Sequence, residues 1–238
     1  DLRLRTKLTA SFILVVLIPV LITGAVRTEE VRQMAIDDAV AEANDNVLRV
    51  KQRSAEVLDV AIDVSFRILF DDRLEQLVNG QYESTYDYVT AFRPYQAFTE
   101  YSRYYSEIDE IRFYIDNPTM INNWSIVHVD SATAELDWFH QAEKREGLIG
   151  WHRVVDAQRK IASRLSLVRR VDFPAYSSYG ILTIDINSAE LNTILAQETF
   201  ETMIVDENNI IVAANRTGRI GRELGEIDMR PRHGDEEG

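Results

Sequence analysis

The hydrophobic pattern begins with an apolar run that contains no charged residue. Residues 8–26 have the sequence LTASFILVVLIPVLITGAV. At about 1.5 Å of rise per residue, a helix of this length just crosses a hydrocarbon core roughly 30 Å thick. Arg3, Arg5 and Lys7 precede the run, and acidic residues follow it. We therefore expect residues 1–7 to be cytoplasmic, residues 8–26 to form a transmembrane helix, and the remainder to lie outside the cell.

A cleaved signal peptide is the alternative interpretation of this run. Thr23 and Ala25 form a small-x-small pair of the kind that signal peptidase recognises. The apolar stretch is longer than the roughly 7–15 residues of a usual signal-peptide core, which favours the uncleaved anchor.

A long helix is predicted over residues 27–70, either unbroken or as two abutting helices. Residues 28–70 contain neither Pro nor Gly and are rich in Ala, Glu, Val, Leu and Arg. Apolar residues recur at a spacing of seven, at Met34, Ala41, Leu48, Ala55, Ile62 and Leu69. This stripe can pack on the protein's own sheet, or it can pair with a second copy of the chain.

After residue 71 the pattern changes to short elements. Residues 71–88 are polar and partly helical, and 88–104 form an amphipathic helix. Residues 108–115 form a strand that ends at the turn signal Asp116-Asn117-Pro118, and we expect 124–129 to pair with it as a hairpin.

The remaining segments predict an antiparallel meander and then a smaller module. A short helix at 137–146, which Gly147 ends, precedes strands at 150–155, 161–171 and 180–186. A helix at 187–197 and a strand pair at 202–205 and 210–214 follow. The fold class is therefore α+β, with a main module at 71–188 and a linker helix with an incomplete second module at 189–238.

Composition excludes several classes of function. A net charge of -13 argues against nucleic acid as a partner. The absence of cysteine excludes disulfides, thiolate zinc sites and cysteine catalysis. The four histidines lack metal-ligand spacing, and neither a Gly-x-Ser-x-Gly elbow nor a phosphate loop is present. We expect no enzymatic activity, no metal and no cofactor.

The order of these elements resembles the YesM-like sensor histidine kinases of Gram-positive bacteria. The resemblance rests on Leu17-Ile18-Pro19 in the anchor and on the segments 110–117, 137–139, 165–169, 180–186 and 204–221. It implies a double Cache region, in which two PAS-like sheets stack along the long helix. It also implies a second membrane helix, a HAMP linker and a kinase, none of which this sequence contains. We therefore expect the N-terminal part of a receptor, with the membrane-proximal module incomplete.

The resemblance also implies where a ligand binds, namely between the distal sheet and the short helix that covers it. Strand alternation places Arg112, Tyr114 and Asp116 on one face, and Thr183 and Asp185 on one face of their own strand. Aromatic faces suit sugars or cations, although each Trp also fits core packing and Asp185 also fits a solvated strand. The candidate ligand-binding residues are Tyr114, Asp116, Trp124, Trp138, Arg169 and Asp185.

The nature of the ligand is constrained by one departure from related domains. Cache domains that bind amino acids carry an Arg-x-Trp pattern. In this sequence Leu136, and not Arg, stands two residues before Trp138. The resemblance instead suggests a saccharide or a solute-binding protein as partner. The expected function is extracytoplasmic ligand sensing by a membrane-anchored homodimer. The alternative is a secreted or chemoreceptor-type solute-binding module without a kinase output.

Overall fold

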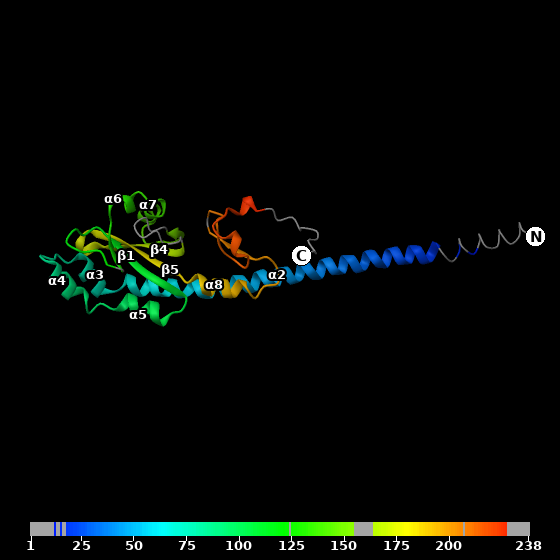
Figure 1. Ribbon diagram of the computed structural model, residues 1–238, viewed down its shortest axis with the longest axis horizontal. Coiled ribbons are helices and arrows are strands. Elements are labelled where there is room, and N and C mark those ends of the chain that lie inside the picture. Colours follow the sequence, from blue (N-terminus) through cyan, green and yellow to red (C-terminus); the bar gives the residue numbers. More distant parts are fainter. Residues whose placement is uncertain are drawn as a thin grey trace, which may run out of the picture. The chain divides into compact units, whose positions relative to one another are not determined.

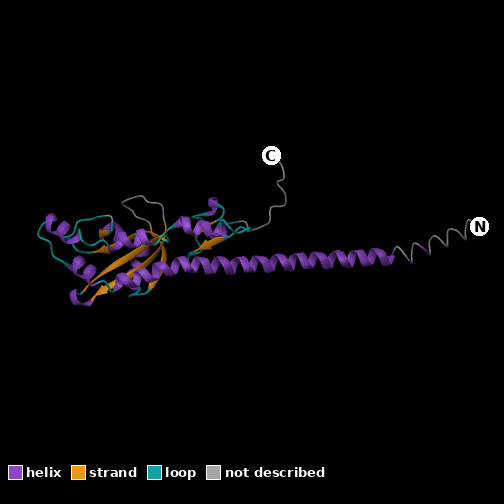
Figure 2. Ribbon diagram, turned by 90° about the horizontal axis from the view of Figure 1, so that it is seen from below, coloured by secondary structure: helices purple, strands orange, loops and turns teal. Residues whose placement is uncertain are grey.

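The computed structural model describes residues 12, 15, 18–123, 125–154, 164–206 and 208–227 of the 238-residue chain. The chain divides into two compact units, residues 1–49 and residues 50–238. The first unit contains the N-terminal part of helix α2 (Ile18–Leu69), which Figure 2 shows as one continuous helix. The second unit contains the rest of α2 and the other helices and strands described below.

The long helix predicted over 27–70 is confirmed, and α2 begins earlier than predicted, at Ile18. It ends where Asp71 caps the next helix, since the Asp71 carboxylate accepts hydrogen bonds from the backbone N–H groups of Arg73 and Leu74. The predicted cytoplasmic segment 1–7 lies outside the described residues, and so does much of the predicted span 8–26. No helix among the described residues has the length and apolar character that a membrane crossing requires.

The face of α2 that packs in the second unit is not the predicted stripe. Its buried hydrophobic residues are Val50, Val57, Ala61, Val64 and Ile68. Their spacing of three, four and seven follows the 3.6-residue turn of a straight helix. In the predicted stripe Ala55 is exposed, whereas Ile62 and Leu69 are half-buried against the core. In the first unit the stripe residues Met34, Ala41 and Leu48 are exposed.

Three short helices follow, α3 (Asp72–Asn79), α4 (Thr85–Phe92) and α5 (Ala97–Tyr104). The prediction of one helix over 88–104 was wrong, because α4 and α5 are separate. Pro94 lies between them, and proline has no N–H group to donate to a carbonyl of the preceding turn. The Tyr95 N–H donates to the Phe92 carbonyl instead and closes a turn.

The main sheet has five strands in the order β2-β1-β5-β4-β3. The strands are β1 (Ile108–Ile115), β2 (Ile126–His128), β3 (Ile149–Val154), β4 (Arg164–Phe173) and β5 (Ser178–Ile186). The predicted antiparallel meander is confirmed, since β4 pairs antiparallel with both β3 and β5. β1 completes the antiparallel part of the sheet by pairing with β5.

The predicted hairpin between 108–115 and 124–129 was wrong, because β2 pairs parallel to β1 and the sheet is mixed. A tight turn at 116–118 would give an antiparallel pair. Asn117 instead donates from its side-chain amide to the carbonyls of Val78 and Gly80, each at 2.9 Å. The connection is thereby held at the end of α3, and the chain returns alongside β1 before β2 begins.

Helices cover both faces of the sheet (Figure 1). One face packs against α3, α5, α8 (Ser188–Leu195) and the C-terminal part of α2. The buried residues of this layer include Phe113, Leu167 and Ile184. The other face packs against α7 (Asp137–Lys144), with α6 (Ser131–Ala134) beside it. Strand alternation produces these two packed layers, because successive side chains of a strand point to opposite faces of the sheet.

The predicted strand pair near the C-terminus is confirmed. β6 (Met203–Val205) and β7 (Ile211–Ala214) pair antiparallel, and Asp206 accepts hydrogen bonds from the backbone of Asn208 and Ile210 in the turn between them. Short 3-10 helices η3 (Thr217–Arg219) and η4 (Leu224–Glu226) follow, and another, η2 (Pro174–Tyr176), links β4 to β5. Residues 228–238 of the predicted second module lie outside the described residues.

Candidate functional site

The sheet face beneath α7 carries a row of polar side chains across four strands. Glu110 of β1 pairs with Asp185 of β5, Asp185 pairs with Ser166 of β4, and Ser166 pairs with His152 of β3. Paired residues point to the same face of a sheet. Asp185, Ser166 and His152 are all buried. Buried polar groups are costly unless they are hydrogen-bonded, so this row requires a specific arrangement of partners.

Arg112 supplies a buried positive charge on this face. Its side chain is only 2% exposed, and its guanidinium forms an ion pair with Glu110. Its Nη2 atom lies 3.8 Å from Oδ2 of Asp185. The other oxygen of Asp185, Oδ1, accepts a hydrogen bond of 2.6 Å from the Ser166 hydroxyl. The cation and the two carboxylates therefore form one connected group.

Burial and pairing act in opposite directions on these charges. Burial raises the pKa of Asp185 above its ordinary value, although the Ser166 hydrogen bond and the Arg112 charge oppose that rise. Burial lowers the pKa of Arg112, but the hydrogen bond to Glu110 and the charge of Asp185 outweigh it, so the Arg112 pKa is raised. The site thus combines a permanent cation with a carboxyl group that ionises less readily than an exposed aspartate.

Aromatic rings form the other part of this face. The rings of Tyr114 and Trp138 meet edge to face, with centroids 5.3 Å apart, and both side chains are buried. Among the described residues, the Trp138 indole N–H and the Thr183 hydroxyl are buried without a hydrogen-bond partner. An unsatisfied buried polar group costs about 1–3 kcal/mol. Trp138 also lines a pocket, so its indole N–H is a place where a ligand can supply the missing partner, whereas Thr183 is fully buried.

The structure does not bring all predicted site residues together. Tyr114 and Asp185 share a face through the pairing of β1 with β5, and Trp138 covers it. Asp116 follows β1 and its side chain is 85% exposed, with Oδ1 lying 3.9 Å from Nδ1 of His128. Arg169 points to the opposite face, toward α2. Trp124 lies outside the described residues.

A pocket of about 510 Å³ adjoins this polar face. Trp138 and His152 line it, together with Asp137 and Gln141 of α7 and Arg153 of β3. The turn between β6 and β7 lines the same pocket through Asp206, Asn208 and Ile210. Its volume lies within the range of small-molecule sites.

Sequence reasoning missed several of the polar residues that the fold gathers here. Arg112 shares the face of Tyr114, but nothing in the sequence indicates that it is buried and paired with Glu110. Ser166 becomes a partner of Asp185 only through the register of β4 and β5. Alternation along β1 could have included Arg112, whereas Ser166 and His152 require the strand pairing.

Comparison of the sequence with known families and with curated proteins finds no match. No model of a known protein family matches the chain. No curated protein is significantly similar to it.

Solved structures, in contrast, are similar in fold. The sensor domain of the histidine kinase DctB from V. cholerae matches 80% of this chain and 71% of its own, at 10% identity and a TM-score of 0.54. An extracellular ligand binding receptor from Desulfohalobium retbaense DSM5692 matches 76% of this chain and 33% of its own, at 8% identity and a TM-score of 0.52. The ligand-binding domain of the Campylobacter jejuni chemoreceptor Tlp3, in complex with L-valine, matches 80% of this chain and 76% of its own, at 16% identity and a TM-score of 0.49.

The two structures with TM-scores above 0.5 identify the class of fold. The chain is an α+β protein with the fold of Cache-type sensor domains, in which a long N-terminal helix accompanies a mixed sheet. At such low identity the similarity concerns the fold alone.

Proposed function

We propose that this chain is the extracytoplasmic ligand-sensing region of a membrane-anchored signalling receptor, and that its ligand binds on the sheet face beneath α7. The observation that carries the proposal is the group of buried polar side chains on that face. Arg112 and Asp185 offer charges of both signs, while Thr183 and Trp138 offer hydrogen-bonding groups that lack a partner among the described residues. A fold of the Cache sensor class supports the same location.

The ligand that fits this face is small and polar and carries both donors and acceptors. A donor group on the ligand would meet Asp185, and an acceptor would meet the Trp138 indole N–H. Leu136 occupies the place of the arginine in the Arg-x-Trp pattern and packs against the hydrophobic cluster that contains Tyr114 and Trp138. A saccharide is therefore our preferred ligand over an amino acid, with a solute-binding protein as an alternative partner.

The output that we propose is a two-component histidine kinase of the YesM-like kind. Residues 8–26 would anchor the receptor in the membrane, and residues 27–238 would lie outside the cell. Two copies would pair along α2, whose residues Met34, Ala41 and Leu48 are exposed. A secreted or chemoreceptor-type module without a kinase is the alternative, and fold similarity to an extracellular ligand binding receptor supports it equally.

The proposed site is tested by thermal unfolding of the chain against mono- and oligosaccharides, amino acids and organic acids. A ligand at 100 times its Kd adds about 2.7 kcal/mol to the free energy of unfolding, which raises Tm measurably. We expect Asp185→Asn and Trp138→Phe to abolish the shift, because both groups would contact the ligand.

Asp172→Asn is the matched control, since Asp172 is an exposed aspartate on the neighbouring strand β4. It should keep the full shift. A ligand whose effect survives both Asp185→Asn and Trp138→Phe would show that it binds elsewhere. Absence of any shift across the panel would favour a protein partner.

A further inference from the structure

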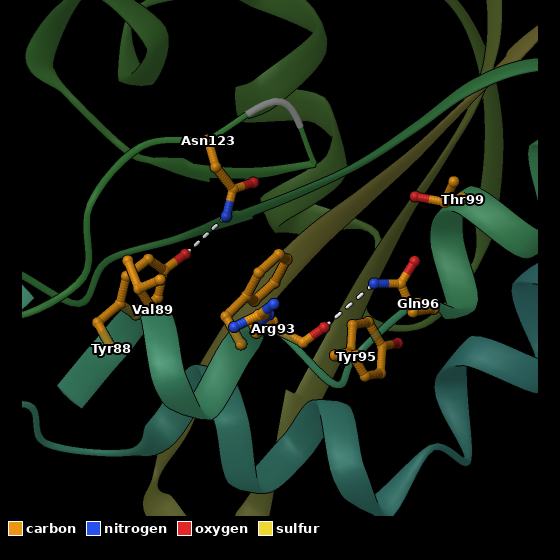
Figure 3. Close-up of a pocket in the computed structure, with 8 residues that line it drawn as sticks. Tyr88, Val89, Arg93, Tyr95, Gln96, Thr99 and Asn123 are labelled. Atoms are coloured by element: carbon orange, nitrogen blue, oxygen red, sulfur yellow. Dashed lines mark hydrogen bonds between the residues drawn. The ribbon is translucent and has the colours of Figure 1, made fainter. Parts of the chain in front are cut away.

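A second pocket, of about 320 Å³, lies at α4, α5 and the turn between them (Figure 3). Asn123, in the connection that leads into β2, lines it from another part of the chain. None of its lining residues belongs to the pocket beside α7. It is therefore separate from the site of the proposed function.

Aromatic rings form one wall of this second pocket. Tyr88 and Phe92 stack with ring centroids 5.8 Å apart, and Phe92 lies 6.1 Å from Tyr95. Tyr88 and Tyr95 are buried and fixed by their hydroxyls. The Tyr88 hydroxyl accepts a hydrogen bond of 2.7 Å from the Asn123 amide, which Figure 3 shows, and the Tyr95 hydroxyl donates to Asp71. The wall is thus preformed, and the half-buried Phe92 is the most exposed of its three rings.

The wall also remains uncharged at physiological pH. Burial raises the pKa of Tyr88 to about 12, although the Asn123 hydrogen bond opposes the rise. Burial and the charge of Asp71 raise the pKa of Tyr95 still further. Both rings therefore act as neutral apolar surfaces.

Arg93 supplies the charge at this pocket. Its side chain is exposed, and within the described part of the chain its guanidinium has no hydrogen-bond or ion-pair partner. Its backbone is held, because its N–H donates to the Val89 carbonyl and its carbonyl accepts from the Gln96 amide at 3.1 Å. No carboxylate side chain is among the residues that line the pocket. Arginines elsewhere, such as Arg112 and Arg170, are paired with acids.

An aromatic wall beside a single available guanidinium matches one chemical class. We propose that this pocket binds a small organic carboxylate that carries a flat ring. The ring would pack against Tyr88 and Phe92, and the carboxylate would accept a forked pair of hydrogen bonds from Arg93. The volume, at the lower end of the range for ligand sites, suits a molecule of one or two rings.

The test is calorimetric titration of the full chain with benzoate, phenylacetate and indole-3-acetate. Benzamide and acetate are the matched control ligands, because benzamide keeps the ring without the charge and acetate keeps the charge without the ring. We expect at least one ring carboxylate to bind at least roughly tenfold more tightly than both controls, as the loss of a charge-assisted hydrogen bond implies. No binding by any of the three carboxylates, or equal binding of benzoate and benzamide, would overturn the proposal.

Variants locate the binding. Arg93→Gln should weaken the ring carboxylate roughly tenfold or more, and Arg103→Gln should not, although Arg103 is an exposed arginine of α5 and the charge change is the same. Asp185→Asn should leave this binding intact. If Asp185→Asn abolishes binding and Arg93→Gln does not, the carboxylate occupies the sheet face. That result would overturn this inference while it supports the proposed function.

Discussion

Asp185 is a buried carboxyl group whose ionisation the fold disfavours. Its pKa is raised by burial, against the Ser166 hydrogen bond and the Arg112 charge. A raised native pKa means that the folded state binds the proton more tightly than the unfolded state does. The stabilisation of the folded state by this proton is therefore fully present below the ordinary aspartate pKa of 3.8 and is lost as the pH rises through the higher native pKa. Each unit of raised pKa corresponds to about 1.4 kcal/mol.

Asp185→Asn therefore has a pH-dependent effect on stability. We expect the free energy of unfolding of the unmodified chain to fall relative to that of the variant between pH 4 and pH 7. Urea unfolding at several pH values in this interval measures the difference. Arg112 keeps Glu110 as its partner in the variant. A difference that is constant with pH, or that changes in favour of the unmodified chain, would show that the Arg112 and Ser166 contacts outweigh burial.

At the scale of single residues, the sequence predicted which face of its strand a side chain occupies. It did not predict which other side chain it contacts. Alternation correctly placed Arg112 with Tyr114 on one face of β1 and Thr183 with Asp185 on one face of β5, because it depends only on the geometry of a strand. The contact between Asp185 and Ser166 depends on strand register, which the pattern of residues 164–186 leaves open. The exposure of Asp116 follows from its place just beyond β1, where none of the described elements covers it.

Among the elements, β4 and α2 are joined by one buried side chain, Arg169. Its Nε donates to the Gly147 carbonyl at 3.0 Å and its Nη1 to the Ser65 hydroxyl at 3.3 Å. The guanidinium also lies 4.3 Å from the ring centre of Phe66. Gly147 precedes β3 in the connection from α7, so Arg169 links the helix that covers the polar face with α2.

Arg169→Met should destabilise the chain by about 1–3 kcal/mol, since it keeps the apolar stem and removes the hydrogen bonds of a charged donor. Urea unfolding measures this change. Arg103→Met, on the surface of α5, should stay within about 0.5 kcal/mol. Burial lowers the pKa of Arg169, and the described residues include no ion-pair partner for it. If Arg169→Met is neutral or stabilising, the cost of burying the cation equals or exceeds what its contacts contribute.

The errors at the element scale have physical causes of different kinds. Pro94 is a signal for the break between α4 and α5 that the sequence does contain, and the amphipathic pattern on either side of it outweighed that signal in the prediction. The parallel pairing of β2 has no local signal. It depends on Asn117 bonding to Val78 and Gly80, more than thirty residues earlier in the chain.

For the whole molecule, the proposed receptor requires that two copies meet. The predicted stripe of Met34, Ala41 and Leu48 is exposed, whereas the packed face of α2 consists of other residues. Exposed apolar residues at a spacing of seven fit a paired helix, although Asp38 and Asp45 flank them. The sequence predicted the stripe, but periodicity could not say which partner covers it.

Cysteine cross-linking tests this pairing without interference, because the chain has no cysteine of its own. In a dimer paired along the stripe, Met34→Cys and Leu48→Cys should each form a disulfide-linked dimer under mild oxidation, visible by non-reducing electrophoresis. Ala39→Cys is the control, since Ala39 is exposed but lies about 200° around the helix from Ala41. Equal cross-linking at all three positions would indicate random collision, and no cross-linking at Met34 and Leu48 would contradict pairing through this face. Because a disulfide requires Cα atoms within about 7 Å, selective cross-linking at the two stripe positions would fix both the face and the parallel register of the dimer.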